Sequence, residues 1–161
     1  MTSETGSPPR TVAAVDQVDV RGPRFAAWVT TVVLVATLLV STVSLTVAAV
    51  ILGLQAGVFA IGAVRGPRKH PYGLIFANVV APRLAPVSEK EPVPPLKFAQ
   101  LVGFVFAVVG TAGFATGLGT LGLIATGFAL VAAFLNAAFA ICLGCQLYPL
   151  VTRFRRTTSP A

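Results

Sequence analysis

Two cysteines are the residues of this chain best suited to chemistry. They lie three positions apart in the segment Cys142-Leu143-Gly144-Cys145, and the chain has no others. Thiol–disulfide exchange needs only two thiols that can bridge and one nucleophile that a partner can reach. Positions three apart share one face of a helix, so both sulfurs can point towards the same partner. The pair is therefore a candidate redox site.

A metal or cofactor bound at this pair would need further ligands. Structural zinc takes four ligands, commonly two cysteine pairs or one pair with histidines, and the chain has a single histidine. An iron–sulfur cluster takes four cysteines. Covalent haem attachment takes a histidine directly after the second cysteine, where this chain has Gln146. We therefore predict no metal site in a single chain, and no cofactor is evident. A metal site would need ligands from more than one chain of an oligomer.

Inert packing is the other interpretation of the pair, because cysteine also behaves as a small apolar side chain at a helix end. If the pair closes a long helix, the partial negative charge of the helix C-terminus disfavours a thiolate. Redox pairs often lie at helix N-termini instead. Three arginines that follow the pair would offset this charge if the tail folds back: Arg153, Arg155 and Arg156.

Three other polar residues are candidate site residues. Gln55 and Asn136 are the strongest polar groups within apolar sequence, and we expect structural hydrogen bonds between helices, worth on average about 0.6 kcal/mol in membrane proteins. Asn136 lies about half a turn round a continuous helix from Cys145, so it is not expected to reach the pair. His70 follows Lys69 in a basic segment, and we expect it to face solvent or lipid headgroups.

The elements that position these residues follow from the distribution of charge. Every Lys, Arg, Asp and Glu residue lies outside two apolar blocks, residues 25–64 and 98–152. About 20 apolar residues suffice for one transmembrane helix, so each block holds two. The first block turns at residues 41–44, and the second turns at residues 116–120, where glycines allow turn conformations. We predict an all-α integral membrane protein with four transmembrane helices in two hairpins, near residues 25–42, 45–64, 98–116 and 119–147.

Four crossings place both termini and the middle loop on one side of the membrane. All basic residues lie on that side, and loops rich in Lys and Arg stay cytoplasmic. We therefore predict a plasma (inner) membrane domain over residues 25–152, with both termini in the cytoplasm. The net charge of +7 then reflects topology and anionic lipid, so no nucleic-acid partner is expected. The predicted cytoplasmic parts are a disordered tail over residues 1–24, a proline-rich loop over residues 65–97 and a basic tail over residues 153–161.

Several short motifs resemble a bacterial, mainly actinobacterial, membrane family known as domain of unknown function 4395. They are Pro71-Tyr72-Gly73, Pro82-Arg83-Leu84, Phe98-Ala99-Gln100, Leu135-Asn136-Ala137, and the cysteine segment followed by Tyr148. The resemblance carries no established activity. Members of that family tend to be encoded near thioredoxin-like proteins and sulfurtransferases, which implies redox or sulfur chemistry and a cytoplasmic partner of one of those kinds.

We therefore expect a membrane thiol–disulfide redox component linked to sulfur metabolism. Cys145 would be the attacking thiol and Cys142 the resolving thiol. One redox partner would be a soluble thiol protein, and a quinone is a candidate for the other. The alternative is a non-enzymatic membrane anchor, or a permease for a small sulfur species, with inert cysteines. A proton-coupled pump is not expected, because the predicted spans hold no charged residue.

Overall fold

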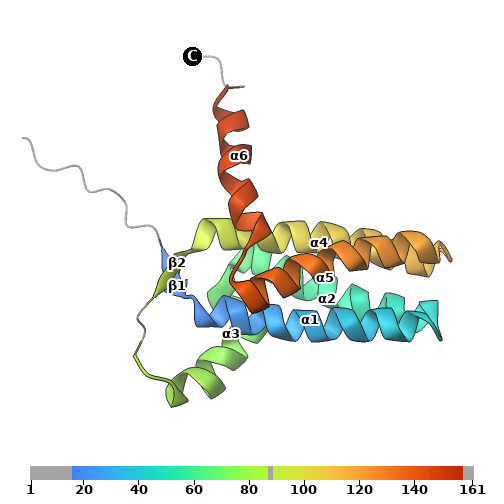
Figure 1. Ribbon diagram of the computed structural model, residues 1–161, viewed down its shortest axis with the longest axis horizontal. Coiled ribbons are helices and arrows are strands. Elements are labelled where there is room, and N and C mark those ends of the chain that lie inside the picture. The colour runs from blue at the N-terminus through green and yellow to red at the C-terminus, as the bar shows by residue number, and fades with distance from the viewer. Residues whose placement is uncertain (1–15, 87–88, 158–161) are drawn as a thin grey trace, which may run out of the picture.

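Four long helices lie side by side and form a bundle (Figure 1). They are α1 (Arg21–Ser41), α2 (Leu45–Arg65), α4 (Val93–Ala115) and α5 (Gly119–Phe139). The computed structural model describes residues 16–86 and 89–157. Each of the four helices is long and apolar enough to cross a membrane. The predicted fold class is confirmed: the chain is an all-α, multi-pass membrane protein.

The bundle is closed by close packing of small and apolar side chains. Helix α2 packs on α4 and α1 packs on α5, while α1–α2 and α4–α5 complete the ring. Leu34, Leu52 and Phe114 are among the fully buried side chains at its centre. A Cβ atom on Gly113 would lie only 2.6 Å from the backbone nitrogen of Gly122, so α4 and α5 meet where neither carries a side chain. Close packing of this kind stabilises a helix bundle in lipid, where no hydrophobic driving force brings helices together.

Two of the four helices begin where they were predicted to begin, α2 at Leu45 and α5 at Gly119, and the other two begin earlier. Helix α1 starts at Arg21 instead of residue 25, and α4 starts at Val93 instead of residue 98. The predicted loop extended to residue 97 because proline in a helix interior breaks the helix. Pro94 and Pro95 instead occupy the first turn of α4, where the fixed φ of proline suits a helix and its missing N–H is not needed.

A two-stranded ribbon orders the N-terminal segment. Strand β1 (Gln17–Asp19) pairs antiparallel with β2 (Lys90–Pro92), with Val18 opposite Glu91. An Arg21–Asp19 ion pair of 2.8 Å holds the start of α1 to β1. Residues 16–24 are thus structured, contrary to the predicted disordered tail, while residues 1–15 lie outside the described chain. Strands of three residues show no alternation that a sequence pattern can reveal.

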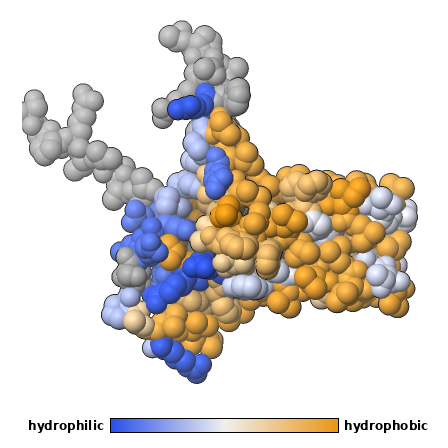
Figure 2. Space-filling model, in the orientation of Figure 1, coloured by the Kyte–Doolittle hydropathy of each residue, from blue (hydrophilic) through white to orange (hydrophobic). Residues whose placement is uncertain are grey.

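The proline-rich segment folds into short helical pieces: η1 (Pro67–Lys69), α3 (Pro71–Ile75), η2 (Phe76–Val80) and η3 (Ala81–Arg83). Helix α3 packs against α1 (Figure 1). Phe76 is buried, with its ring 5.8 Å from that of Phe25. Together with β1 and β2, these pieces cover one end of the bundle, which we call the polar end. Figure 2 shows hydrophilic residues gathered there and an apolar surface along the bundle.

Helix α6 (Leu143–Thr157) corrects the prediction of one continuous helix near residues 119–147. Helix α5 ends at Phe139, and Ala140 takes a left-handed conformation with φ 57°. The Ile141 N–H then donates to the Leu135 carbonyl (3.2 Å), a bond that closes the helix end. Helix α6 runs across the direction of the bundle (Figure 1) and passes through Pro149. Residues 153–157 of the predicted tail are therefore helical, and residues 158–161 lie outside the described chain.

Candidate functional site

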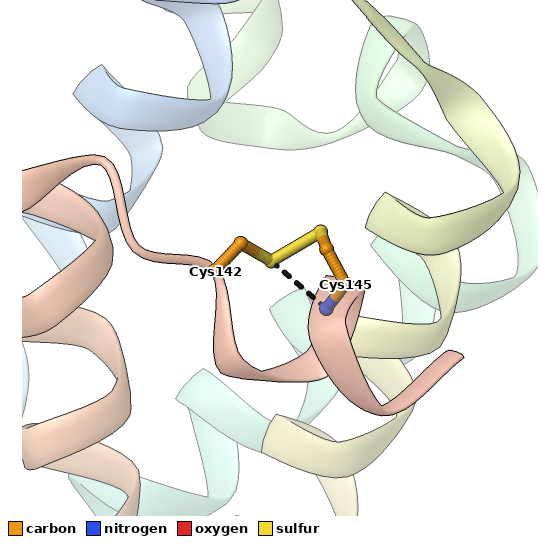
Figure 3. The surroundings of a disulfide bond; sticks show 2 residues. All are labelled: Cys142 and Cys145. Atoms are coloured by element: carbon orange, nitrogen blue, oxygen red, sulfur yellow. Dashed lines mark hydrogen bonds between the residues drawn. A yellow bond between two sulfur atoms is a disulfide. The ribbon is translucent and has the colours of Figure 1, made fainter. Parts of the chain in front are cut away.

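The break after α5 brings the two cysteines together at the start of α6. Cys142 directly precedes the helix and Cys145 lies in its first turn, and the two form a disulfide (Figure 3). Their Cα atoms are 5.2 Å apart, within the range that a disulfide bridges without backbone distortion. Both residues are half-buried. Across the described chain, no three His, Cys, Asp or Glu residues lie close enough together to hold a metal ion.

The electrostatic setting of the pair is the opposite of the one expected from the sequence. The Cys145 backbone N–H donates to Cys142 Sγ (3.3 Å; Figure 3). The Gln146 N–H donates to the Cys142 carbonyl (3.1 Å). Cys142 thus caps the N-terminus of α6, whereas the prediction placed the pair at a helix C-terminus. The partial positive charge of a helix N-terminus and a donated N–H both favour a thiolate. The helix dipole therefore favours a thiolate at this pair, whereas the predicted C-terminal position would disfavour it.

A glycine between the cysteines holds this helix start against α4. A Cβ atom on Gly144 would lie 2.5 Å from Ala99 Cα and 2.6 Å from Ala99 Cβ, so only glycine allows the approach. Nearby, the Tyr148 and Phe98 rings lie 6.1 Å apart, which extends the contact between α6 and α4. The position of the disulfide is therefore set by tertiary contact with α4 as well as by the break after α5.

One of the two cysteines, Cys142, lines a cavity between the helices. This cavity, which we call the redox cavity, has a volume of about 260 Å³ and is bounded by side chains of α1, α2, α4, α5 and the start of α6. Cys142 lies on its wall, together with the amides of Gln100 and Asn136. Asn136 was expected to be turned away from the pair. Because the chain leaves the helix after Phe139, Asn136 and Cys142 reach the same cavity.

Gln100 is a site residue that the sequence analysis did not single out. Its Oε1 atom is buried and has no hydrogen-bond partner within the described residues. It lines the redox cavity and also a second cavity of about 510 Å³, which we call the His70 cavity. A polar residue so near Lys97 is ordinary at a membrane boundary. Only its place in the motif Phe98-Ala99-Gln100 could have indicated a role in the site.

His70 is buried, contrary to the prediction that it faces solvent or headgroups. It is 2% exposed, and neither ring nitrogen has a hydrogen-bond partner within the described residues. Burial lowers the pKa of His70 to about 4, because the charged form loses its hydration. Gly62 explains the burial: a Cβ atom there would lie 2.7 Å from His70 Cδ2, so the bare backbone of α2 accepts the ring.

Gln55 makes a hydrogen bond between helices, as predicted, and its partner lies in the short helix α3. Its Oε1 accepts from the Tyr72 hydroxyl (2.7 Å), so the bond joins α2 to α3 and not to another long helix. Gln55 is 2% exposed, and burial also raises the pKa of Tyr72, which keeps the phenol protonated as a donor. The sequence alone could not pair the two residues, because nothing in it indicates that α3 folds back onto the bundle.

Comparison with known proteins places the chain in a family. The family model described as domain of unknown function (DUF4395) matches residues 18–153, which include every element described above except the last residues of α6 and the start of β1. The chain belongs to this family. No curated protein and no solved structure matches the chain.

Proposed function

We propose that this member of the DUF4395 family is a membrane thiol–disulfide redox component in which Cys142 and Cys145 cycle between disulfide and dithiol. One observation carries the proposal: the Cys145 N–H donates to Cys142 Sγ at the N-terminus of α6. That arrangement stabilises a thiolate on Cys142 and so makes it a good leaving group, since exchange is faster when the leaving thiol is more acidic.

The two sulfurs have different roles in the proposed exchange. A thiolate of a soluble dithiol protein attacks Cys145 Sγ, a mixed disulfide forms, and Cys142 leaves as a thiolate. The partner's second thiolate then attacks its own sulfur in the mixed disulfide and releases Cys145, and the two sulfurs of the site take up protons. The partner becomes a disulfide, having given up two electrons. In the reverse direction Cys145 attacks and Cys142 resolves, as the sequence analysis assigns them.

The assignment of Cys145 to the partner rests on what lies around each sulfur. Cys142 is on the wall of the redox cavity, between helices, where a protein cannot enter, and Cys145 is not among the residues that line it. The pair lies near the polar end, where the basic residues of the long helices also lie, including Arg65 and Lys97. Basic segments stay cytoplasmic, which supports an inner-membrane protein with this end, and a thioredoxin-like partner, in the cytoplasm.

Thiol counting with the full-length protein in membranes tests the cycle. Samples are equilibrated with glutathione buffers of graded potential, and free thiols are alkylated with a polyethylene-glycol maleimide that shifts the band on a gel. We expect both cysteines to change together at one potential, because they form one disulfide. Two cysteines that remain alkylatable at every potential would contradict the proposal.

The roles of the two sulfurs are tested with single variants and thioredoxin that lacks its resolving cysteine. The single thioredoxin cysteine is first converted to a mixed disulfide with thionitrobenzoate. With Cys142→Ser, the remaining Cys145 thiolate should attack that thioredoxin sulfur, release thionitrobenzoate and form a stable mixed disulfide. Cys145→Ser is the matched control, and it should trap much less partner, since Cys142 lies on the cavity wall. Trapping through Cys142 alone would reverse the assignment.

An anchor function is the second candidate, and α6 favours it. This helix leaves the bundle (Figure 1) and carries exposed apolar side chains at Leu147, Leu150 and Val151, with an exposed Arg153. A soluble enzyme that co-purifies equally well with the Cys142→Ser/Cys145→Ser double variant would support the anchor. Loss of co-purification in the double variant would favour exchange.

A further inference from the structure

The redox cavity joins the disulfide to the lipid-facing surface of the bundle. Phe128 lines the cavity and is also 61% exposed on the outside of α5. Its ring stacks on Phe106, another lining residue, with 5.9 Å between the centroids. A molecule dissolved in the bilayer can therefore reach Cys142 sideways, past an aromatic side chain. The same route is unsuited to a charged, water-soluble reagent.

The walls of this cavity indicate the shape and the polarity of a ligand. They are mainly aromatic and aliphatic, which suits a flat, apolar ring, since aromatic faces stack favourably. Two amides, Gln100 and Asn136, interrupt the apolar surface, and Gln100 Oε1 is buried without a hydrogen-bond partner in the described chain. An amide offers both an N–H donor and a carbonyl acceptor. It can therefore bind a ligand oxygen as a carbonyl or as a hydroxyl.

We propose that the redox cavity binds a lipid-soluble quinone, with its ring beside Cys142 and an oxygen hydrogen-bonded to Gln100 or Asn136. The inference rests on the proposed function and names the second redox partner of the same site. A quinone takes two electrons and two protons, which is what a dithiol releases when it forms a disulfide. The volume of about 260 Å³ is close to the lower end of the roughly 300–1,000 Å³ common for ligand pockets, and the His70 cavity adjoins it at Gln100.

The reaction balances without any further reagent. The S–H bonds of Cys142 and Cys145 break and the S–S bond forms, which releases two electrons and two protons. Both carbonyl oxygens of the quinone take up a proton, and the ring takes up the electrons to become a hydroquinone. In the quinone state an amide N–H donates to the ring carbonyl, and in the hydroquinone state the new hydroxyl donates to the amide oxygen. Gln100 and Asn136 are thus suited to both states.

A stoichiometric assay with the full-length protein in detergent micelles tests this inference. The protein is reduced with dithiothreitol, desalted, and mixed with decylubiquinone, whose ring carries no free position for thiol addition. Hydroquinone formation is followed by absorbance and thiols are counted by alkylation. We expect one quinone reduced and two thiols lost per chain. The Cys142→Ser/Cys145→Ser double variant, treated in the same way, should reduce none.

Two Ala→Phe variants test whether quinone reduction takes place in the redox cavity. Ala132 lines the redox cavity, and Ala132→Phe should fill it and slow quinone reduction by about tenfold or more, since displacing a reactant by 1 Å already costs on the order of a hundredfold. Ala112 is exposed on α4 and is not among the lining residues, so Ala112→Phe should react at the wild-type rate. Gln100→Leu should also be slower. Circular dichroism and cooperative thermal unfolding confirm that each variant is folded.

The outcomes separate this inference from the proposed function. A wild-type dithiol that exchanges with thioredoxin but leaves decylubiquinone oxidised overturns the quinone site and leaves the proposed function standing. Failure of both reactions overturns the proposed function itself. Equal rates in the Ala132→Phe and Ala112→Phe variants, at wild-type level, would place any quinone reduction outside the redox cavity.

Discussion

The ends of the two hairpins carry similar sequences and fold differently. Near the end of α2 the chain reads Phe59-Ala60-Ile61-Gly62, and at the end of α5 it reads Phe139-Ala140-Ile141-Cys142. The first segment is helical throughout, and α2 continues to Arg65 before Gly66 ends it with φ 82°. In the second segment the helix stops at Phe139. Alanine and isoleucine at matching positions thus occur in both conformations.

The difference lies in what the following residues contact. After α2, the chain turns at Gly66 and returns so that His70 packs on Gly62. After α5, Gly144 sits directly on Ala99 of α4, and the disulfide closes across it. The chain leaves α5 after Phe139, and Gly144 then docks on α4. The end of a helix within an apolar sequence thus depends on the next tertiary contact, and three predictions test this at the two ends.

The largest effect is expected at the α2 end, where His70 is buried. Its pKa of about 4 in the folded protein lies below the ordinary 6.5, so below pH 6.5 the unfolded chain binds a proton that the folded protein does not. Stability is therefore lost as pH falls from 6.5 towards 4, by on the order of 3 kcal/mol. Thermal unfolding in detergent from pH 7 to 4 measures this loss.

The His70→Leu variant is the control for that pH dependence. It should lose less stability over the same range, and the difference between the two proteins isolates His70. Glu91, whose pKa is raised chiefly by burial, titrates in both. If His70→Leu and the wild type lose stability in parallel, the imidazole is not buried as a neutral group and the α2 end of the comparison is broken.

The next effect is expected at the α5 end, where Gly144 contacts Ala99. Gly144→Ala should destabilise the protein by about 2 kcal/mol, because the new methyl group overlaps backbone atoms of α4. Gly127→Ala inside α5 is the matched control: a Cβ atom there meets nothing within 4 Å, so helix propensity should stabilise by up to about 1 kcal/mol. A melting temperature that shifts in the same direction in both variants would contradict the docking of α6 on α4.

The smallest effect compares the aligned alanines directly. Ala140→Gly should stabilise by about 1 kcal/mol, because glycine has no penalty in the left-handed conformation. Ala60→Gly should destabilise by about 1 kcal/mol, because Ala60 lies within a helix. Shifts of opposite sign in the melting temperatures of the two variants would strengthen the contrast between the two helix ends. Loss of stability in both variants would mean that α5 continues through Ala140.

Much of the bundle was predictable from the sequence, and most of the site was not. The uncharged blocks predicted four helices that can cross a membrane, because such length and apolarity leave few alternatives in lipid. The spacing of Cys142 and Cys145 predicted that they can bridge. The position of the pair at a helix N-terminus was missed. It depends on the break after Phe139 and on the contact of Gly144 with Ala99, which joins residues far apart in the chain.

The polar residues show the same division. Gln55 was identified as a buried hydrogen-bonding group, but its partner Tyr72 comes from a segment whose fold no periodicity indicates. His70 was predicted to face solvent or headgroups because it follows Lys69 in a basic segment, whereas its burial depends on the bare backbone at Gly62. Gln100 was passed over because only the adjoining cavities distinguish it from other boundary residues.

The sequence by itself determined that the chain spans a membrane, how many helices do so, and which two residues can form a disulfide. These properties depend on composition and short spacing, which act locally. Only the tertiary structure decided that Cys142 caps α6, that it faces a cavity with Gln100 and Asn136, and that His70 is buried. The physical reason is that a helix end, a cavity wall and a buried imidazole are each made by side chains from several helices, brought together where glycine leaves space.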